Sequence, residues 1–274
     1  MKKLVITGAA GSVGQQVVPF LAERYRLRLA DVVAPTYAIG EAEFVKADIR
    51  DPAQLRSAFE GADAVIHLGA VGGEDDWDRI LELNINGTYN ALESARLESV
   101  GCFVYSSSVH AIGFYPRNER IDSDNHVRPD SRYGLSKCFG EAACALFADK
   151  YGMRTMAVRI GNVSPPPAAS SEDEATEGRP VRWDERRLSI WVSARDLAQL
   201  FAVAIDNEGY NYALCYGVSN NQRSWWDNSI AYELGYKPED DSEEFAAQLL
   251  ENGPIEDIAS LGATYQGGGF VDLP

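Results

Sequence analysis

The sequence is poor in positive charge and in residues that bind metals or form disulfides. Lysine and arginine together number 25 against 41 aspartates and glutamates, which gives a formal net charge of −16. So few basic side chains exclude a surface that neutralises nucleic-acid phosphates or an anionic membrane. The four cysteines include no CxxC pair and do not cluster with the three histidines, so we expect free thiols and no metal site.

Long apolar runs are also missing. No stretch approaches the roughly 20 residues that cross a bilayer. The N-terminal run from Leu4 to Ile6 is too short for the core of a signal peptide and has no cleavage site after it. We therefore expect a cytoplasmic protein without a membrane partner. With 45% hydrophobic and 24% charged residues, the 274-residue chain has the composition of a globular protein with a large core.

What is present begins with a buried strand and a glycine-rich turn. The continuous apolar residues within 3–7 predict a strand covered on both faces. Gly8, Gly11 and Gly14 follow directly, before a helical pattern over residues 17–21. Strand, turn and helix in this order are the context of a dinucleotide-binding fingerprint. Its glycines let a pyrophosphate approach the backbone, and the helix N-terminus supplies N–H groups.

A carboxylate follows the next predicted strand. Residues 25–29 form that strand, and Asp31 lies 17 residues after Gly14. A carboxylate there accepts hydrogen bonds from both hydroxyls of an adenosine ribose and repels a 2′-phosphate, which favours NAD over NADP. The alternative is a solvated loop aspartate without a ligand.

Further strands alternate with helical patterns along the chain. They are predicted at residues 43–47, 64–70, 102–105, 156–160 and 212–216. This alternation is typical of an α/β fold, here a Rossmann-type doubly wound parallel sheet. We expect an NAD-binding Rossmann core over residues 1–160. Residues 161–274, where the alternation breaks, are expected to contribute the substrate pocket and the last elements of the core.

A helix predicted over residues 77–98 has an apolar stripe with polar residues in its middle. The stripe consists of Ile80, Leu81, Ile85, Tyr89 and Leu92. Asn84 either faces water or faces the sheet and holds a water near a catalytic group. His67, inside an apolar run, is expected to be a core histidine with its hydrogen bonds satisfied.

A tyrosine and a lysine are candidates for proton transfer. Tyr133 and Lys137 are four residues apart, which puts phenol and ammonium on one helix face, where the cation favours the ionised phenol. Taken alone, such a pair is most often an exposed surface pair. Ser106, Ser107 and Ser108 change that interpretation, because they follow a predicted strand at the sheet edge that carries the ligand crevice.

A proline-rich and then acidic stretch precedes the densest positive patch of the chain. Residues 164–178 are expected to form a mobile insertion. Arg182, Arg186 and Arg187 follow around Trp183. A guanidinium fork matches a planar carboxylate and also binds phosphate. The patch is therefore a candidate site for an anionic group of a substrate.

With these residues placed, the chain resembles the extended short-chain dehydrogenases/reductases. The shared motifs are TGxxGxxG at Thr7–Gly14, a serine 25 residues before the tyrosine, and YxxxK. The chain is most similar to the uronate dehydrogenases, through SSxHxIGxYP at Ser107–Pro116, YGxSKCFGE at Tyr133–Glu141, WWDNS at Trp225–Ser229 and QGGxFVD at Gln266–Asp272. The resemblance covers essentially the whole chain.

The resemblance implies a specific reaction. In that family NAD accepts a hydride from C1 of the pyranose form of galacturonate or glucuronate, and an aldonolactone forms. By position, Tyr133 would be the base that takes the proton of the C1 hydroxyl. Lys137 would lower the pKa of that phenol and bind the nicotinamide ribose, and Ser108 would hydrogen-bond the reacting oxygen. Arg186 would clamp the substrate carboxylate.

The resulting assignments cover chemistry, cofactor and substrate. The catalytic residues are Ser108, Tyr133 and Lys137, and no residue is assigned to a metal. NAD is assigned to Gly8, Gly11, Ser12, Val13, Gly14, Asp31, Asp48, Ile49, Leu68, Gly69, Ala70, Asn84, Ser106, Ser107, Tyr133, Lys137 and Ile160. The substrate is assigned to Ser108, His110, Tyr133, Asn162, Arg186 and Phe270.

Two positions depart from the uronate dehydrogenase pattern. Val109 stands where the family has an asparagine, and Gly72 where it has a serine. Both family side chains contact substrate hydroxyls, so their loss removes contacts that discriminate sugars. An insertion at about residues 168–182 lies beside the substrate side. Another aldose or a sugar phosphate is therefore an alternative substrate.

Other functions and the assembly state are also open. A sugar epimerase or dehydratase shares the scaffold but keeps its cofactor through the cycle, and a protein that only binds NAD needs no catalytic triad. By analogy with extended members, the helices near residues 77–99 and 132–150 are expected to form the interface of a homo-oligomer, a dimer or higher.

Overall fold

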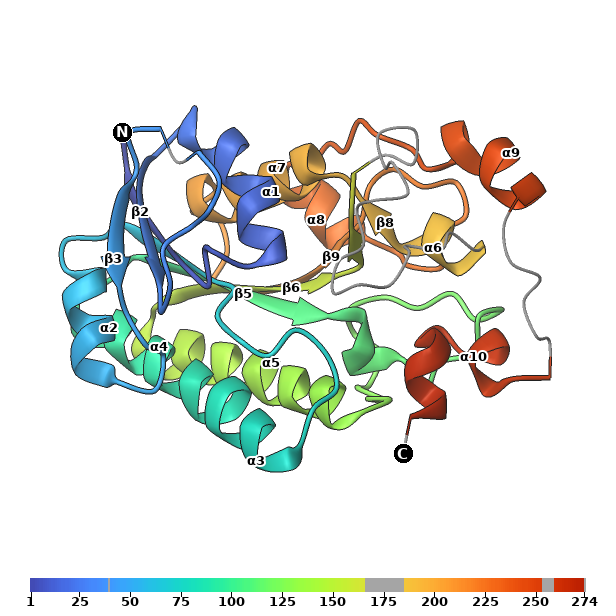
Figure 1. The fold of residues 1–274 in the computed structure, drawn as a ribbon, viewed down its shortest axis with the longest axis horizontal. Coiled ribbons are helices and arrows are strands. Elements are labelled where there is room, and N and C mark those ends of the chain that lie inside the picture. The colour runs from blue at the N-terminus through green and yellow to red at the C-terminus, as the bar shows by residue number, and fades with distance from the viewer. Residues whose placement is uncertain (39, 166–184, 253–258, 274) are drawn as a thin grey trace.

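Seven parallel strands form the centre of the computed structural model, which describes residues 1–38, 40–165, 185–252 and 259–273. They are β1 (Lys3–Thr7), β2 (Arg26–Asp31), β3 (Glu43–Lys46), β4 (Ala64–His67), β5 (Cys102–Ser108), β6 (Arg154–Ile160) and β9 (Tyr212–Gly217). Their order in the sheet is β3-β2-β1-β4-β5-β6-β9 (Figure 1). The chain winds outward from β1 and starts again at β4, which confirms the doubly wound fold.

Helices cover both faces of the sheet. Those that pack against it are α1 (Ser12–Ala22), α2 (Pro52–Phe59), α4 (Gly87–Leu97), α5 (Arg132–Tyr151), α7 (Ala194–Asp206) and α8 (Ser229–Leu234). Helices α1, α7 and α8 lie on one face, and α2, α4 and α5 on the other (Figure 1). Alternate residues of β1 supply both cores: Leu4 and Ile6 pack under α1 and α7, and Val5 under α2 and α4.

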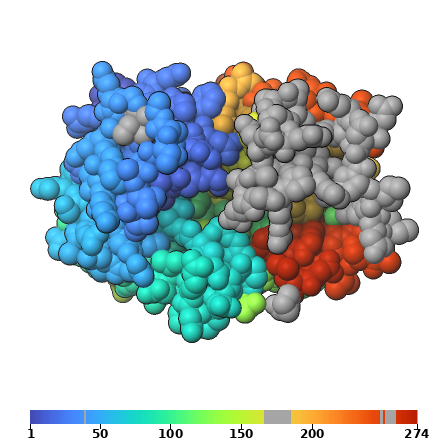
Figure 2. All heavy atoms as spheres, in the orientation of Figure 1, coloured from blue at the N-terminus to red at the C-terminus, as the bar shows by residue number. Residues whose placement is uncertain are grey.

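The part of the chain after residue 160 belongs partly to the sheet and partly to a separate edge. β9 pairs with β6 and completes the sheet. The shorter elements are β7 (Asn162–Val163), β8 (Trp191–Val192), α6 (Glu185–Ile190), α9 (Glu243–Asn252), α10 (Leu261–Thr264) and a 3-10 helix (Gly268–Asp272). α10 lies beside the segment that follows β5, where Arg117 N donates to Thr264 O at 2.9 Å (Figure 1). Figure 2 shows N-terminal residues and these C-terminal residues on opposite sides of one face.

Strand β5 is longer than predicted. Its pairing with β6 continues through Ser106, Ser107 and Ser108, so the three serines belong to the strand and not to a loop after it. A strand directs successive side chains to opposite faces. The three hydroxyl groups therefore cannot all face the same side of the sheet.

The helix predicted over residues 77–98 is continuous but changes its geometry. It begins as α3 (Trp77–Arg79), continues as a π-helix (Ile80–Asn86) and ends as α4. The prediction of one apolar stripe was wrong, because Ile80 and Leu92 are buried whereas Leu81 and Tyr89 are exposed. Hydrogen bonds in a π-helix join residues five apart, which rotates the following residues relative to a regular α-helix.

The apolar side chains of α5 and the cysteines differ in burial. Phe139 and Leu146 are exposed and do not join Cys144 and Phe147 in the core. The four cysteines are free, as predicted, and Cys138 is only half-buried. None of the helices in the described ranges is long and apolar enough to cross a membrane.

Candidate active site

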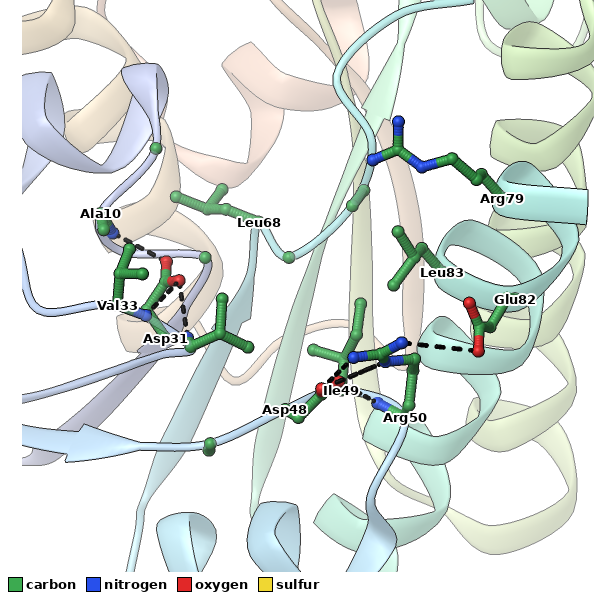
Figure 3. A pocket seen from close by; sticks show the side chains of 16 residues that line it. Ala10, Asp31, Val33, Asp48, Ile49, Arg50, Leu68, Arg79, Glu82 and Leu83 are labelled. Carbon is green, nitrogen blue, oxygen red and sulfur yellow. Dashed lines mark hydrogen bonds and ion pairs between the residues drawn. The ribbon is translucent and has the colours of Figure 1, made fainter. Parts of the chain in front are cut away.

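A cavity of about 560 Å³ lies at the C-terminal ends of β1, β2, β3 and β4 (Figure 3). It includes the gap between β1 and β4, where the winding of the sheet reverses and ligands of such sheets bind. The predicted cofactor residues in its lining are Gly8, Gly11, Asp31, Asp48, Ile49, Leu68, Gly69 and Ala70. They come from four strand ends that are far apart in sequence.

Asp31 ends β2 with its carboxylate held in one orientation. Oδ2 accepts a hydrogen bond from Ala10 N at 2.9 Å, and Oδ1 accepts one from Val32 N at 2.7 Å. A carboxylate has about four acceptor sites. It therefore retains capacity for two ribose hydroxyls, and its place in the cavity wall differs from that of a solvated loop aspartate.

The glycine turn after β1 allows the turn after β4 to approach closely, because it has no side chain at its first position. Gly8 has φ +66°, and a Cβ there would lie 2.6 Å from Gly69 N. Thr7 Oγ1 accepts a hydrogen bond from Gly69 N at 3.4 Å and bonds His67 Nδ1 at 2.7 Å. These contacts bring the turns after β1 and β4 together, and this cradle fits a dinucleotide pyrophosphate.

His67 is a core histidine, as predicted, but only one of its ring nitrogens has a partner. Nδ1 bonds Thr7, whereas no described residue bonds the buried Nε2, since the ring packs against Phe103 and Tyr105. The expectation of a fully satisfied side chain was therefore wrong. Burial, with a smaller contribution from Lys137, lowers the pKa of His67 to about 3, so the ring is neutral at pH 7.

Charged side chains that the sequence analysis did not assign form the opposite wall. Arg50 binds Asp48 through Nη2–Oδ2 at 2.6 Å and Nε–Oδ1 at 3.0 Å (Figure 3). Arg50 also approaches Glu82 on the π-helix at 3.6 Å, and Arg79 lines the same wall. The hydrogen bonds from Arg50 lower the pKa of the Asp48 carboxyl. Arg50 was detectable in the sequence only through its place two residues after a strand-end aspartate.

The other predicted cofactor residues lie outside the lining of this cavity. They are Ser12, Val13, Gly14, Asn84, Ser106, Ser107, Tyr133, Lys137 and Ile160. Asn84 faces the sheet, where Oδ1 accepts from Val71 N at 2.8 Å and Nδ2 donates to Ser136 Oγ at 3.1 Å. Ser107 donates to Glu141 at 2.5 Å, so its hydroxyl is directed to the α5 side and not to a cofactor.

Ser108, Tyr133 and Lys137 meet where the end of β5 faces the first turns of α5. Tyr133 is only 9% exposed, and its phenol lies close to the Ser108 side chain. The interpretation as an exposed surface pair is therefore wrong. Burial raises the pKa of Tyr133 to about 12, whereas the nearby Ser108 hydroxyl acts in the opposite direction.

Lys137 is buried beside the phenol. Its Nζ donates to Ser106 O at 2.7 Å and lies 5.4 Å from the centroid of the Tyr133 ring. Burial lowers the pKa of Lys137 to about 7, and Glu141 opposes this shift. The expected lowering of the Tyr133 pKa is not found in this arrangement, because burial of the phenol dominates and the ammonium binds a carbonyl group.

Aromatic and charged side chains gather on the other side of the phenol. The His110 ring stacks on Phe270 with centroids 3.7 Å apart and lies edge-on to Tyr133 at 5.9 Å. Burial lowers the pKa of His110, and Asp130, 2.7 Å from Nδ1, opposes this. A carboxylate partner assigns the proton to Nδ1, which leaves Nε2 as a hydrogen-bond acceptor for a hydroxyl group.

Arg186 on α6 adds a positive charge to this group. Its Nε donates to Gln266 O at 2.6 Å, and its charge lowers the pKa of His110. Gly268 has φ +63°, and a Cβ there would lie 2.6 Å from Arg186 Nε, so the C-terminal turn admits the guanidinium only as glycine. Asn162, the remaining predicted substrate residue, lies in β7 and donates to Ser164 Oγ at 3.0 Å. Arg182, Trp183 and the insertion predicted at about residues 168–182 lie outside the described residues.

The two positions that depart from the uronate dehydrogenase pattern carry no polar side chain toward this group. Val109 is buried and packs with Ile112 and Trp226 in a separate apolar cluster. The Cα of Gly72 faces open space. These two positions therefore add no polar side chain to the group around His110 and Arg186, unlike the pattern.

A buried ion pair that the sequence analysis missed supports the end of β5. Glu141 on α5 binds Arg159 on β6 through two hydrogen bonds of 2.9 Å and also accepts the bond from Ser107. Arg159 reaches Tyr216 of β9 at 3.2 Å. The signal was present in YGxSKCFGE, since Glu141 follows Lys137 by one helical turn.

Comparisons with known proteins agree with this geometry. The sequence model of the NAD dependent epimerase/dehydratase family matches residues 4–213. A uronate dehydrogenase of Pseudomonas putida is 38% identical over 98% of this chain and 95% of its own length. A NAD-dependent glucose-6-phosphate dehydrogenase of Haloferax volcanii is 32% identical over 93% of this chain and 98% of its own. A crystal structure of an Agrobacterium tumefaciens uronate dehydrogenase variant complexed with NAD has a TM-score of 0.90 and 36% identity, covering 100% of this chain and 98% of that one.

Proposed function

The chain belongs to the NAD dependent epimerase/dehydratase family, and from this premise we propose that it is an NAD-dependent dehydrogenase that oxidises C1 of a uronic acid. Galacturonate and glucuronate are the proposed substrates, and the aldonolactone is the product. One observation carries the proposal. The buried Ser108, Tyr133 and Lys137 lie between the cavity at the strand ends, which suits a dinucleotide, and the group of side chains around His110, which suits a sugar acid.

Tyr133 is proposed as the base that removes the proton of the C1 hydroxyl group. When bound, NAD accepts the hydride that leaves C1, so the sugar loses two electrons and the remaining proton passes to the phenolate. A pKa of about 12 makes the phenolate a strong base that is scarce at neutral pH. The nearby Ser108 hydroxyl favours the ionised form, whereas Lys137 donates to the Ser106 carbonyl in this arrangement.

The proposed cofactor is NAD. Gly8 and Gly11 would admit the pyrophosphate, and Asp31 would accept hydrogen bonds from both adenosine ribose hydroxyls. Its negative charge would repel a 2′-phosphate, which disfavours NADP. Asp48 and Ile49 would lie at the adenine, and Lys137 and Ser106 would lie toward the nicotinamide ribose.

The proposed sugar contacts are side chains beside the phenol. His110 Nε2 can accept a hydrogen bond from a ring hydroxyl while its face packs on Phe270. Arg186 would bind the carboxylate of a uronate, because a guanidinium offers two parallel N–H groups to its two oxygens. Ser108 would hydrogen-bond the oxygen on C1, and Asn162 is proposed at the far edge of the sugar.

Turnover of a substrate panel tests the function. Purified protein with NAD is offered galacturonate, glucuronate, neutral aldoses and glucose 6-phosphate, and NADH formation is recorded. We expect the uronates to give the highest kcat/KM, and deuterium placed on their C1 to appear in the reduced cofactor. Absence of NADH with every sugar would contradict the proposal, and NAD that copurifies without net reduction would favour an epimerase or dehydratase.

Glucose 6-phosphate is the second candidate substrate. The observation in its favour is the similarity to the Haloferax volcanii enzyme together with the apolar Val109 and the bare Gly72. The guanidinium of an arginine such as Arg186 can bind phosphate as well as carboxylate. A higher kcat/KM for glucose 6-phosphate than for either uronate would replace the uronate proposal while leaving the dehydrogenase chemistry in place.

We also propose that two copies associate through α4 and α5. The supporting observation is a set of exposed apolar side chains on α5 and the helix that runs into α4, namely Trp77, Leu81, Tyr89, Leu135, Phe139 and Leu146. Clusters of this kind on a protein surface typically mark interaction sites. Sedimentation analysis should give a dimer or larger assembly that Leu146→Glu dissociates, and a monomeric wild-type protein would contradict this.

A cytoplasmic location is proposed as well. The four free cysteines, three of them buried, suit a reducing compartment. Rapid alkylation of intact cells should recover all four as thiols. Recovery of a disulfide-bonded form would contradict the proposal.

A further inference from the structure

The segment that joins β4 to the following helix reaches across to the catalytic helix through one carboxylate. Its first residues, Leu68, Gly69 and Ala70, line the cavity. Glu74, four residues later, accepts a hydrogen bond from Tyr133 N at 2.9 Å with Oε2, and Oε1 accepts one from Arg132 Nε. The carboxylate is nearly buried, at 12% exposure, so solvent competes little for these bonds.

We propose that Glu74 is a positioning residue that holds the first turn of α5, and with it the phenol of Tyr133, in register with the cavity. The first N–H groups of a helix have no acceptor within the helix, and a carboxylate there is favoured by the helix dipole. Ser131 satisfies one of these groups locally, by accepting from Gly134 N at 3.0 Å. Glu74 satisfies the N–H of Tyr133 from a segment 59 residues away.

A second contact ties the same segment to the same helix. Asn84 accepts from Val71 N at 2.8 Å, donates to Val71 O at 3.2 Å, and donates to Ser136 Oγ on α5 at 3.1 Å. Ser136 in turn donates to Tyr133 O at 2.6 Å. The backbone N–H and the backbone carbonyl of Tyr133 are therefore both linked to the segment that follows β4. Of the two links, the one through Glu74 is direct and charged, whereas the one through Asn84 passes through Ser136.

The position of Glu74 relative to the sugar side adds an electrostatic link. Its charge raises the pKa of His110, so the carboxylate acts on the same group of side chains that faces Tyr133. A cap that served stability alone would need neither this proximity nor an acceptor from the segment whose first residues line the cavity. The arrangement links occupation of the cavity to the position of the base, and it rests on the proposed dehydrogenase activity.

The test compares Glu74→Ala and Glu74→Gln with Glu98→Gln as control. Glu98 is also a partly buried glutamate paired with an arginine, Arg56, at the end of α4. Displacement of a catalytic group by about 1 Å costs about 100-fold in rate. We expect Glu74→Ala to lower kcat about 10- to 100-fold with a smaller change in the KM of the sugar.

Glu74→Gln should recover most of the loss, because its amide oxygen can still accept from Tyr133 N. The control should match wild type in both constants. A Glu74→Ala protein with kcat within about twofold of wild type and only a lower melting temperature would overturn the proposal and leave a stabilising helix cap.

The affinity for NAD, followed by tryptophan fluorescence, separates this inference from the proposed function. If wild type forms no NADH with any sugar of the panel, the proposed function fails. The Glu74 link is then judged by NAD binding alone. A several-fold weaker NAD affinity in Glu74→Ala, restored in Glu74→Gln, supports the link, and unchanged affinity overturns it. If Glu74→Ala does not fold, Glu74→Gln and Arg132→Ala are compared. The link is supported if Arg132→Ala lowers kcat or the affinity for NAD and Glu74→Gln preserves both. Equal values in the two variants overturn it.

Discussion

The cofactor side and the substrate side of this molecule are built in different ways. The cavity wall consists of strand ends and turns, where Gly8, Asp31 and Gly69 act largely through backbone atoms or a backbone-held carboxylate. The group around His110 takes its members from the 3-10 helix after β5 (Val109–Ile112), from α5 and α6, and from the C-terminal 3-10 helix, and its contacts are made by side chains. Backbone atoms do not change with the side chain, so we expect single substitutions to alter the second side more readily than the first.

The largest expected effect is at the junction of the two sides. Tyr133→Phe removes the proposed base, and general base catalysis contributes about 100- to 10,000-fold, so kcat should fall by that factor. NAD affinity should stay within a few-fold of wild type. A near-normal rate in this variant would show that the phenol is not the base, and that Tyr133 does not connect the cofactor side with the substrate side.

Arg186→Ala should affect the substrate side and leave the cofactor side unchanged. Loss of one partner of a buried charged pair costs about 2 kcal/mol or more, so kcat/KM for galacturonate should fall about 30-fold or more. Turnover of a neutral aldose should change little, and NAD affinity should not change. Arg195→Ala, which removes an exposed arginine paired with Asp240, serves as the control. Equal losses for charged and neutral sugars would show that Arg186 does not bind the carboxylate.

Asp31→Ser tests the cofactor side in the same way. A hydrogen bond to a charged group contributes about 1.5 to 3 kcal/mol, so the KM for NAD should rise about 10- to 150-fold. Activity with NADP should increase, because the repulsion of the 2′-phosphate is gone. Asp63→Asn changes the same residue type at the opposite edge of the sheet, where it binds Lys3 N, and should leave this preference unchanged. An unaltered ratio of NAD to NADP activity in Asp31→Ser would contradict the role of Asp31.

The smallest expected effect concerns stability and pH at Lys137. In the folded protein its pKa is lowered to about 7, against an ordinary value of 10.5 in the unfolded chain. Between these values the unfolded chain binds more protons, so stability rises with pH, by at most about 1.4 kcal/mol per pH unit. Compared with Lys137→Met, wild type should gain a few degrees in melting temperature from pH 7 to pH 9. If the melting temperatures of wild type and Lys137→Met changed with pH in parallel, Lys137 would not be buried in its neutral form.

The predictable features are those in which a short stretch contains the whole signal. The turn after β1, the aspartate at the end of β2 and the strand periodicity are local, and the observed sheet follows from them. The predictions that failed depended on direction in space. Tyr89 is exposed after a π-helix that rotates the stripe, Leu81 directly follows the buried Ile80, and Ser107 bonds Glu141 because strand residues alternate.

The sequence by itself determined the doubly wound fold, and it predicted the place of the cofactor and the identity of the base, since each is encoded by spacing within one strand, turn or helix. Only the tertiary structure decided that Lys137 binds the Ser106 carbonyl, that Arg50 closes the cavity wall beside Asp48, and that Glu74 holds the backbone of Tyr133. The Lys137 and Glu74 contacts join segments whose separation along the chain carries no local pattern. Burial then set the charge states, because the free energy of a charge depends on its surroundings and not on its neighbours in sequence.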